Sequence, residues 1–351
     1  MPGMTSDAAN TQVLVTGASG FIAMHCILQL LDAGYQVRGT VRSLKRTAQV
    51  ETALKAHGAD TSRQSFVAAD LTQDSGWDAA MQGITYALHV ASPLPRTPPK
   101  HPDELIVPAR DGALRVIRAA QAAGVTRLVM TSSIAAVLYG HKRDGSETYD
   151  ESHWSILSKD VGAYEQSKTI AERAAWDLVE SFPAEQRLEF CTINPGLVLG
   201  PVLDSDYGTS GEVVRKLMAR EMPGCPDIGW AMVDVRDVAS AHLAAMLKPE
   251  AVGKRFVASV QHASMLDVAR ILEQHFAERG FKIPTRRVPG WLLRVVALFD
   301  KTAALAVQEL GKRQDLDTTQ IKTVLDWQPR GLEEMVVSMG ESLIEHRVVT
   351  A

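Results

Sequence analysis

A tyrosine and a lysine four residues apart, Tyr164 and Lys168, are side chains that could do chemistry together. Residues at this spacing share one face of a helix, and residues 161–181 are predicted to be helical. Reduction of a carbonyl by hydride builds negative charge on its oxygen, which then needs a proton donor. A neighbouring cation lowers the pKa of a phenol from about 10. The pair predicts Tyr164 as proton donor and Lys168 as the cation that lowers its pKa; an exposed helix face is the alternative.

A third candidate is Ser133, which stands two residues after the predicted strand 127–131. The carboxyl ends of parallel strands line the mouth where a doubly wound sheet binds its ligand. A hydroxyl at this place can hydrogen-bond the same carbonyl oxygen. Ser133, Tyr164 and Lys168 are therefore the predicted catalytic residues.

The start of the chain carries a glycine turn between an expected strand and an expected helix over 19–33. Residues 13–15 are apolar and suit a central parallel strand. Gly17 permits backbone geometry that a Cβ would obstruct, and Gly20 leaves room for a pyrophosphate against the amides of the helix start. An ordinary strand-to-helix turn is the alternative. At the start of a long α/β chain the pattern predicts dinucleotide binding, and Lys168 could then also donate to a nicotinamide ribose.

The residues after the second expected strand, over 36–42, indicate which dinucleotide is bound. A carboxylate at this strand end selects NAD, and a basic residue accepts the additional phosphate of NADP. No acidic residue occurs from position 33 to 50, whereas Arg42 falls at the strand end and Arg46 one helical turn further on. Together they could clamp a phosphate with charge-assisted hydrogen bonds, which predicts NADP(H) as the cofactor.

Four other polar residues have simpler expectations. Arg38 and Lys45 are expected on a solvated basic face. Asp70, after the third expected strand, either accepts a hydrogen bond from the adenine amino group or caps a turn. Asp237 is expected to cap a helix.

Strand-like and helical segments alternate over residues 1–199. The alternation predicts a doubly wound parallel sheet of Rossmann type, with helices on both faces, that carries the catalytic residues. Glycine- and proline-rich turns after position 199 predict a smaller substrate-binding lobe over 200–351, some elements of which return to the first domain. The expected strands beyond the first are 36–42, 65–69, 84–90, 127–131, 188–194 and 255–260, and the expected helices are 19–33, 45–57, 75–82, 103–123, 161–181, 212–221, 235–247, 264–279, 291–311 and 332–346.

The 351 residues carry a formal net charge of −4 and are 46% hydrophobic, which is typical of a globular protein. No basic run interleaved with aromatic residues indicates a nucleic-acid surface, and no apolar run approaches the ~18 residues of a membrane span. The N-terminus lacks the pattern of a signal peptide, and Cys26, Cys191 and Cys225 lack metal or redox spacing, so a reduced, cytoplasmic location is expected. His89 and His141 have no partner at metal-ligand spacing, and no metal is expected.

Eight motifs occur in an order that is specific as a set: TGASGFIA (16–23), GTVR (39–42), HVASP (89–93), TSS (131–133), DESHW (150–154), YEQSK (164–168), INPGLVLGP (193–201) and VDVRDVA (233–239). In these motifs the chain resembles the extended short-chain dehydrogenases/reductases. Within them it is similar to the branch of dihydroflavonol reductases, cinnamoyl-CoA reductases and microbial aldehyde or methylglyoxal reductases. The likeness covers most of the chain.

The resemblance implies an NADP-dependent oxidoreductase whose catalytic serine is Ser133 and not Ser132. The Asn-Trp-Cys-Tyr run of plant cinnamoyl-CoA reductases is absent, which argues against a CoA thioester as substrate. Homodimers are frequent among related enzymes, so a second copy of the chain is a candidate partner. The cofactor contacts that the resemblance implies are Gly17, Phe21, Ile22, Arg42, Asp70, Leu71, Ala91, Ser92, Tyr164, Lys168 and Pro195.

The substrate pocket is expected beside the catalytic residues. Its lining residues are mostly apolar or uncharged, which suits a ketone or aldehyde with apolar bulk. The sequence therefore predicts an NADPH-dependent carbonyl reductase that acts reversibly as an alcohol dehydrogenase. A nucleotide-sugar epimerase or dehydratase that recycles its bound cofactor, and an NADP-sensing regulator without turnover, stay open as alternatives. The expected substrate-binding residues are Ser92, Leu94, Tyr139, Tyr207 and Trp230.

Overall fold

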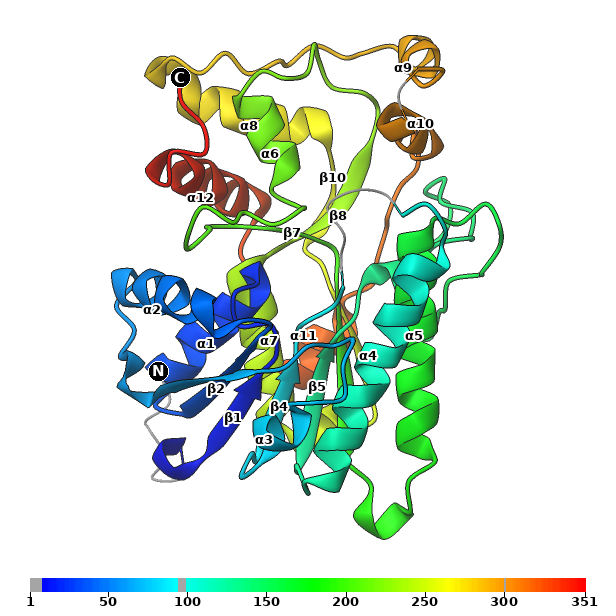
Figure 1. The fold of residues 1–351 in the computed structure, drawn as a ribbon. Helices are drawn as coiled ribbons and strands as arrows, with labels where there is room; N and C mark the ends of the chain where they lie inside the picture. Colours follow the sequence, from blue (N-terminus) through cyan, green and yellow to red (C-terminus); the bar gives the residue numbers. More distant parts are fainter. Residues whose placement is uncertain (1–7, 94–98, 300) are drawn as a thin grey trace.

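Seven strands form a central sheet with helices on both faces, and a smaller lobe lies above it in the view of Figure 1. The computed structural model describes residues 8–93, 99–299 and 301–351. The strand order is β3-β2-β1-β4-β5-β6-β9, and every neighbouring pair is parallel. The predicted doubly wound sheet is thus confirmed. Its strands are β1 (Gln12–Val15), β2 (Gln36–Val41), β3 (Gln64–Ala68), β4 (Tyr86–His89), β5 (Arg127–Thr131), β6 (Glu189–Pro195) and β9 (Arg255–Ala258).

Side chains of β1 alternate between two cores, because successive residues of a strand point to opposite faces. Val13 and Val15 pack in the core that includes the helix after β1, whereas Leu14 packs in the core on the other face. The strand order reverses between β1 and β4, and ligands of such sheets bind at the carboxyl ends of the strands at this point. The helices of the first face are α1 (Phe21–Asp32), α2 (Thr47–Ala56) and α7 (Val235–Leu247), and those of the second are α3 (Trp77–Met81), α4 (Asp103–Ala122) and α5 (Ala163–Glu180).

The smaller lobe is built on a three-stranded sheet of order β10-β8-β7 with its own apolar core. β7 begins only two residues after β6 ends, so the chain passes directly from the carboxyl edge of the large sheet into the lobe. No helix in the described part of the chain is long and apolar enough to cross a membrane. The elements are β7 (Leu197–Leu199), β8 (Gly229–Asp234), β10 (Gln261–Ser264), α6 (Glu212–Met218), α8 (Met265–Phe276), α9 (Gly290–Val296), α10 (Lys301–Gln308) and α12 (Leu332–Glu345), and α11 (Thr319–Leu325) packs against β9.

Several elements after β6 differ from the prediction. β7, β8, β10 and α11 were not expected, because apolar alternation over three to seven residues is too short to identify an element. Close pairing in this small sheet depends on Gly229, where an added Cβ would lie 2.6 Å from His262 Nε2. The expected helix 291–311 is two helices, α9 and α10, and α9 buries none of its residues.

Two polar residues have partners that the sequence did not predict. The cap of α7 is Asp234, whose side chain accepts from the Arg236 amide, so the prediction for Asp237 was wrong. Asp237 instead accepts from the Arg330 amide at 2.6 Å and is 2% exposed. The guanidinium of Arg38 donates to carbonyls at the end of α3, including that of Gln82 at 2.7 Å, so this residue is not part of a solvated face either.

A buried histidine of α7 makes stability depend on pH. Burial lowers the pKa of His242 to about 4, and the hydrogen bond to the Val238 carbonyl only opposes this shift. The other ring nitrogen lies 2.7 Å from the Thr131 hydroxyl. An unfolded histidine titrates near ~6.5, so the unfolded chain binds the proton first and stability falls as the pH falls from about 6.5 towards 4. This residue alone is expected to remove about 2 kcal/mol between pH 7 and 5.

Urea unfolding of the wild type and His242→Gln at both pH values measures this difference. The variant should lose about 2 kcal/mol less than the wild type on acidification. His101→Gln, at an exposed position, is the control and should behave as the wild type does. An equal loss in all three proteins would contradict the assignment.

Candidate active site

Gly17 brings the turn after β1 against the end of β4. Its φ is +69°, which favours glycine, and its amide donates to the Thr40 hydroxyl at 3.0 Å. An added Cβ would lie 2.9 Å from the Cβ of Ala91. The chain thus leaves a cradle at the topological switch point that a side chain at position 17 would fill.

The helix after this turn begins without a side-chain cap. Gly20 is the N-cap of α1, and its amide donates to the Gly17 carbonyl at 2.8 Å. Phe21 and Ile22 form the first turn of the helix and are half-buried. The first amides of a helix that lack a side-chain cap are suited to bind an anion. The residues present therefore fit the pyrophosphate of a dinucleotide.

Thr16 and His89 join the same two strand ends and were not predicted as functional residues. The Ala91 amide donates to the Thr16 hydroxyl at 2.9 Å, which in turn lies 2.9 Å from Nδ1 of His89. Burial, aided by the charge of Lys168, lowers the pKa of His89 to about 3, so this histidine is neutral. The expectation that His89 has a polar partner is confirmed by this contact. The signal that could have revealed Thr16 is its place directly before Gly17.

The basic residues after β2 lie at the surface. Arg42 is exposed, and Arg46 Nη2 is 3.7 Å from Asp206 of the smaller lobe in an exposed ion pair. Asp70 accepts from the amide and hydroxyl of Thr72, both at 2.8 Å, so it caps a turn. The Thr72 amide is the main cause of its lowered pKa, and the charge of Arg42 adds to it, which places Arg42 near Asp70. These three residues gather where β2 and β3 end.

The other expected cofactor residues follow the same edge of the sheet. Leu71 comes after β3, Ala91 and Ser92 after β4, and Pro195 is the last residue of β6. Leu71 packs against Gly112, where an added Cβ would be 3.0 Å from the Leu71 Cβ. Leu94 lies outside the described residues.

Ser133 and Tyr164 are brought together by different elements. Ser133 follows β5 and caps the 3-10 turn η4 (Ile134–Ala136), where its Oγ accepts from the Ala135 amide at 3.1 Å. Tyr164 lies in the first turn of α5, near enough to Ser133 for the serine hydroxyl to lower the pKa of the phenol. Nζ of Lys168 is 5.8 Å from the centroid of the Tyr164 ring. The three residues predicted from the sequence therefore meet at the carboxyl edge of the sheet.

The charge states at this cluster differ in part from the prediction. Burial raises the pKa of Tyr164, and the nearby Ser133 hydroxyl only opposes this, so the predicted lowering by Lys168 was wrong. The phenol consequently holds its proton at neutral pH. Burial lowers the pKa of Lys168 to about 8, and the nearby Glu172 carboxylate opposes that change.

The expected aromatic substrate-binding residues belong to two different apolar clusters of the structure. Tyr207 and Trp230 pack against the core of the smaller lobe, as does Phe21. Tyr139 belongs to another cluster and is linked to the lobe by Gln314, which donates to the Tyr139 hydroxyl at 3.3 Å and accepts from the Ala231 amide at 2.9 Å. Gln314 was missed because nothing in its local sequence marks it.

A comparison with models of protein families shows to which family the chain belongs. The model of the NAD dependent epimerase/dehydratase family matches residues 13–259. The chain belongs to this family. Within it, the chain lies in the branch of extended short-chain dehydrogenases/reductases that its motifs resemble, and it is an oxidoreductase.

Named relatives of this family support the assignment. The NADPH-dependent methylglyoxal reductase GRE2 of Saccharomyces cerevisiae is 35% identical, over 79% of this chain and 86% of the relative. Cinnamoyl-CoA reductase CAD2 of Medicago truncatula is 36% identical, over 77% of this chain and 82% of the relative. The crystal structure of yeast methylglyoxal/isovaleraldehyde reductase Gre2 complexed with NADPH superposes with a TM-score of 0.79 at 28% identity, covering 96% of this chain and 99% of the other.

Proposed function

We propose that this protein is an NADPH-dependent carbonyl reductase that reduces a ketone or aldehyde carrying an apolar group. The observation that carries the proposal is that Ser133, Tyr164 and Lys168 meet at one edge of the sheet: the Ser133 hydroxyl lies near enough to the Tyr164 phenol to lower its pKa, and Lys168 lies beside the tyrosine ring. A phenol, a hydroxyl and an ammonium gathered at the carboxyl edge of the sheet are the groups that a developing alkoxide needs.

The cofactor is NADP(H). The related reductases that are NADPH-dependent or crystallised with NADPH support this. In this chain, Gly17 and the start of α1 would hold the pyrophosphate, and Arg42 with Arg46 would hold the additional phosphate. When bound, the cofactor supplies the hydride.

The chain's own residues then manage the proton. Tyr164 donates its phenolic proton to the carbonyl oxygen as negative charge builds there. Ser133 directs its hydroxyl proton to the same oxygen and orients it, because its lone pair is already engaged by the Ala135 amide. Lys168 stabilises the phenolate left behind, which requires the lysine to be charged.

The expected substrate-binding residues favour a substrate with an apolar group over a sugar nucleotide with phosphate groups. Tyr139 carries the guanidinium of Arg143 on its ring, 4.2 Å from the centroid. That guanidinium is bound by both carboxylate oxygens of Glu309, at 2.7 and 2.8 Å. A cation neutralised in this way is not available to a sugar nucleotide, whereas the aromatic rings of Tyr139, Tyr207 and Trp230 suit apolar bulk.

Oxidation of NADPH in the presence of aliphatic, aromatic and α-dicarbonyl ketones and aldehydes tests this function, with NADH run in parallel. We expect consumption of NADPH with bulky apolar carbonyls and much slower consumption of NADH. No turnover of any carbonyl by protein that binds NADPH would contradict the proposal.

Arg42→Ala is expected to weaken NADPH binding by about 10- to 100-fold and to leave NADH binding nearly unchanged. The reason is the loss of charge-assisted hydrogen bonds, each worth about 1.5–3 kcal/mol, to a phosphate that NADH lacks. Fluorescence titration with both nucleotides measures the effect. Lys45→Ala, at an exposed position in the same turn, is the matched control and should alter neither affinity. An equal loss for both nucleotides in Arg42→Ala would count against the phosphate clamp.

A further inference from the structure

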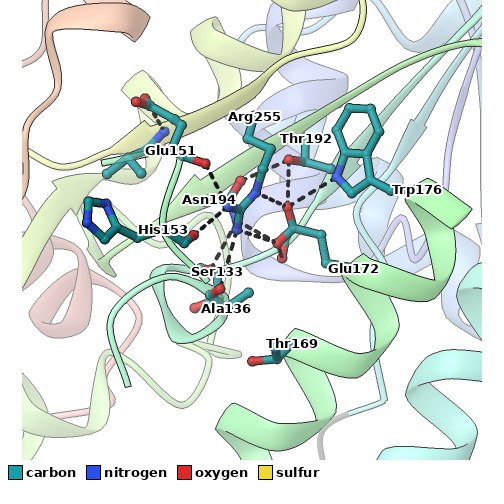
Figure 2. A network of polar contacts seen from close by, with 12 residues as sticks. Ser133, Ala136, Glu151, His153, Thr169, Glu172, Trp176, Thr192, Asn194 and Arg255 are labelled. Atoms are coloured by element: carbon teal, nitrogen blue, oxygen red, sulfur yellow. Dashed lines mark hydrogen bonds and ion pairs between the residues drawn. The ribbon is translucent and has the colours of Figure 1, made fainter. Parts of the chain in front are cut away.

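A buried ion pair lies directly behind the catalytic residues. Glu172 lies one helical turn beyond Lys168 on α5 and has no solvent exposure. Arg255, the first residue of β9, donates from Nε to its Oε1 at 2.7 Å and places Nη2 3.4 Å from Oε2. Figure 2 shows the two side chains facing each other at the centre of a polar network. A buried charge of this kind is tolerated only with its partner in place, so the pair is a fixed unit of the fold.

The carboxylate of Glu172 reaches the backbone of the catalytic serine by two routes. Its Oε2 accepts from Ser132 Oγ at 2.5 Å, and Ser132 directly precedes Ser133. It also accepts from Asn194 Nδ2 at 2.7 Å, and the same amide group lies 3.2 Å from the carbonyl oxygen of Ser133 (Figure 2). Ser133 is thereby held from the residue before it and from its own carbonyl.

Arg255 holds the segment that follows the serine. Its Nη2 lies 3.4 Å from the carbonyl oxygen of Ala136, the last residue of η4, which Ser133 caps. Its Nη1 donates to the carbonyls of Glu151 and His153 at 2.8 and 2.6 Å. The guanidinium therefore fixes η4 and the loop before α5 to the same carboxylate.

Glu172 also belongs to the surroundings of Lys168. The groups that face this ammonium are Tyr164 and Glu172 on its own helix and His89 on β4. His89 is neutral, so the negative charge of Glu172 is the influence that opposes the loss of the lysine proton on burial. The guanidinium of Arg255, the partner of Glu172, is held in the ion pair with that carboxylate.

We propose that Glu172 is a positioning residue for carbonyl reduction, which fixes the backbone of Ser133 through Ser132 and Asn194 and stabilises the charge of Lys168 from one helical turn away. The inference rests on the proposed function. Glu172 acts through other residues and does not touch the substrate.

Glu172→Gln tests this proposal, because it removes the charge with little change in shape. We expect kcat per folded molecule to fall about 10- to 100-fold through misplacement of Ser133, with little change in KM. We also expect the fall in kcat at basic pH, which Lys168 sets near its pKa of about 8 in the wild type, to move to lower pH. A residue with only a structural role would lower the folded fraction and leave this pH profile in place.

Two other variants separate the contributions. Asn194→Ala removes the contact to the Ser133 carbonyl but keeps the charge of Glu172, so kcat should fall without a shift of the basic limb. Asp237→Asn, at another buried carboxylate paired with an arginine, is the matched control. It should lower the melting temperature and leave kcat per folded molecule and the pH profile as in the wild type.

The outcomes separate this inference from the proposed function. If the wild type is active and Glu172→Gln has the same kcat and the same pH profile as the wild type, only the inference is overturned. If Glu172→Gln does not fold, Asn194→Ala decides, and an unchanged kcat in that variant would overturn the inference. If the wild type shows no carbonyl reduction, or if its carbonyl reduction does not depend on Tyr164, the proposed function is overturned and the inference falls with it.

Discussion

Replacing Tyr164 by phenylalanine is expected to lower carbonyl reduction by about 10²- to 10⁴-fold, the range measured for loss of a general acid. The variant keeps the ring and its packing but removes the proton that the raised pKa of Tyr164 holds in place at neutral pH. Without that proton, negative charge on the substrate oxygen has only the Ser133 hydroxyl for stabilisation. Steady-state kinetics with NADPH and a bulky ketone measures the loss, and the affinity for NADPH should change far less.

Tyr86→Phe is the matched control for this experiment. Tyr86 lies at the opposite, amino end of β4, so its variant should turn over as the wild type does. Full activity in Tyr164→Phe would show that another group donates the proton.

Replacing Lys168 by methionine is expected to lower turnover by about 10²- to 10³-fold and to raise the melting temperature at neutral pH. The activity falls because nothing then stabilises the charge left on Tyr164. Stability rises because burial of the ammonium is unfavourable, as its pKa of about 8 indicates. Methionine fills a similar space without a charge to desolvate.

The pH dependence of this gain follows from the direction of the pKa shift. An unfolded lysine titrates near ~10.4, so below pH 8 both states of the wild type are charged and the folded state carries the full desolvation penalty. Between about 8 and 10.4 the unfolded chain binds the proton that the folded chain has released, and the wild type gains stability as the pH rises. The advantage of Lys168→Met should therefore be largest below pH 8 and shrink above it. Lys55→Met, at an exposed position, should show no such trend; equal melting temperatures of Lys168→Met and the wild type at pH 7 would contradict the argument.

Most of the large sheet could be predicted from the sequence, because its first five strands alternate with helices along the chain. The segment that contains Val13 and Gly17 is the clearest case, since buried strand, glycine with positive φ and uncapped helix all follow from it. The smaller lobe was less predictable. Its strands are short and pair with segments distant in sequence, as β7 does with β8, so local periodicity carries little information about them.

Some residues of the candidate site could likewise be predicted from the sequence, and others could not. The spacing of Tyr164 and Lys168 is local and could be recognised at once, whereas the Glu172–Arg255 pair joins residues 83 positions apart. Neither of these two residues stands in a pattern that the sequence reading singled out. The pKa of Tyr164 could not be derived from spacing either, because burial is the main cause of its rise and burial depends on the whole fold.

Transfer of deuterium from NADPH labelled at the reactive carbon of the nicotinamide tests the central claim most directly. A carbonyl reductase produces an alcohol that carries one deuterium on the former carbonyl carbon, with one cofactor oxidised for each product formed. Mass spectrometry of the product and measurement of the oxidised cofactor give both quantities. We expect this result for a bulky apolar ketone with the wild type and its loss in Tyr164→Phe. A product without deuterium, or a substrate converted while the cofactor is returned unchanged, would contradict the account.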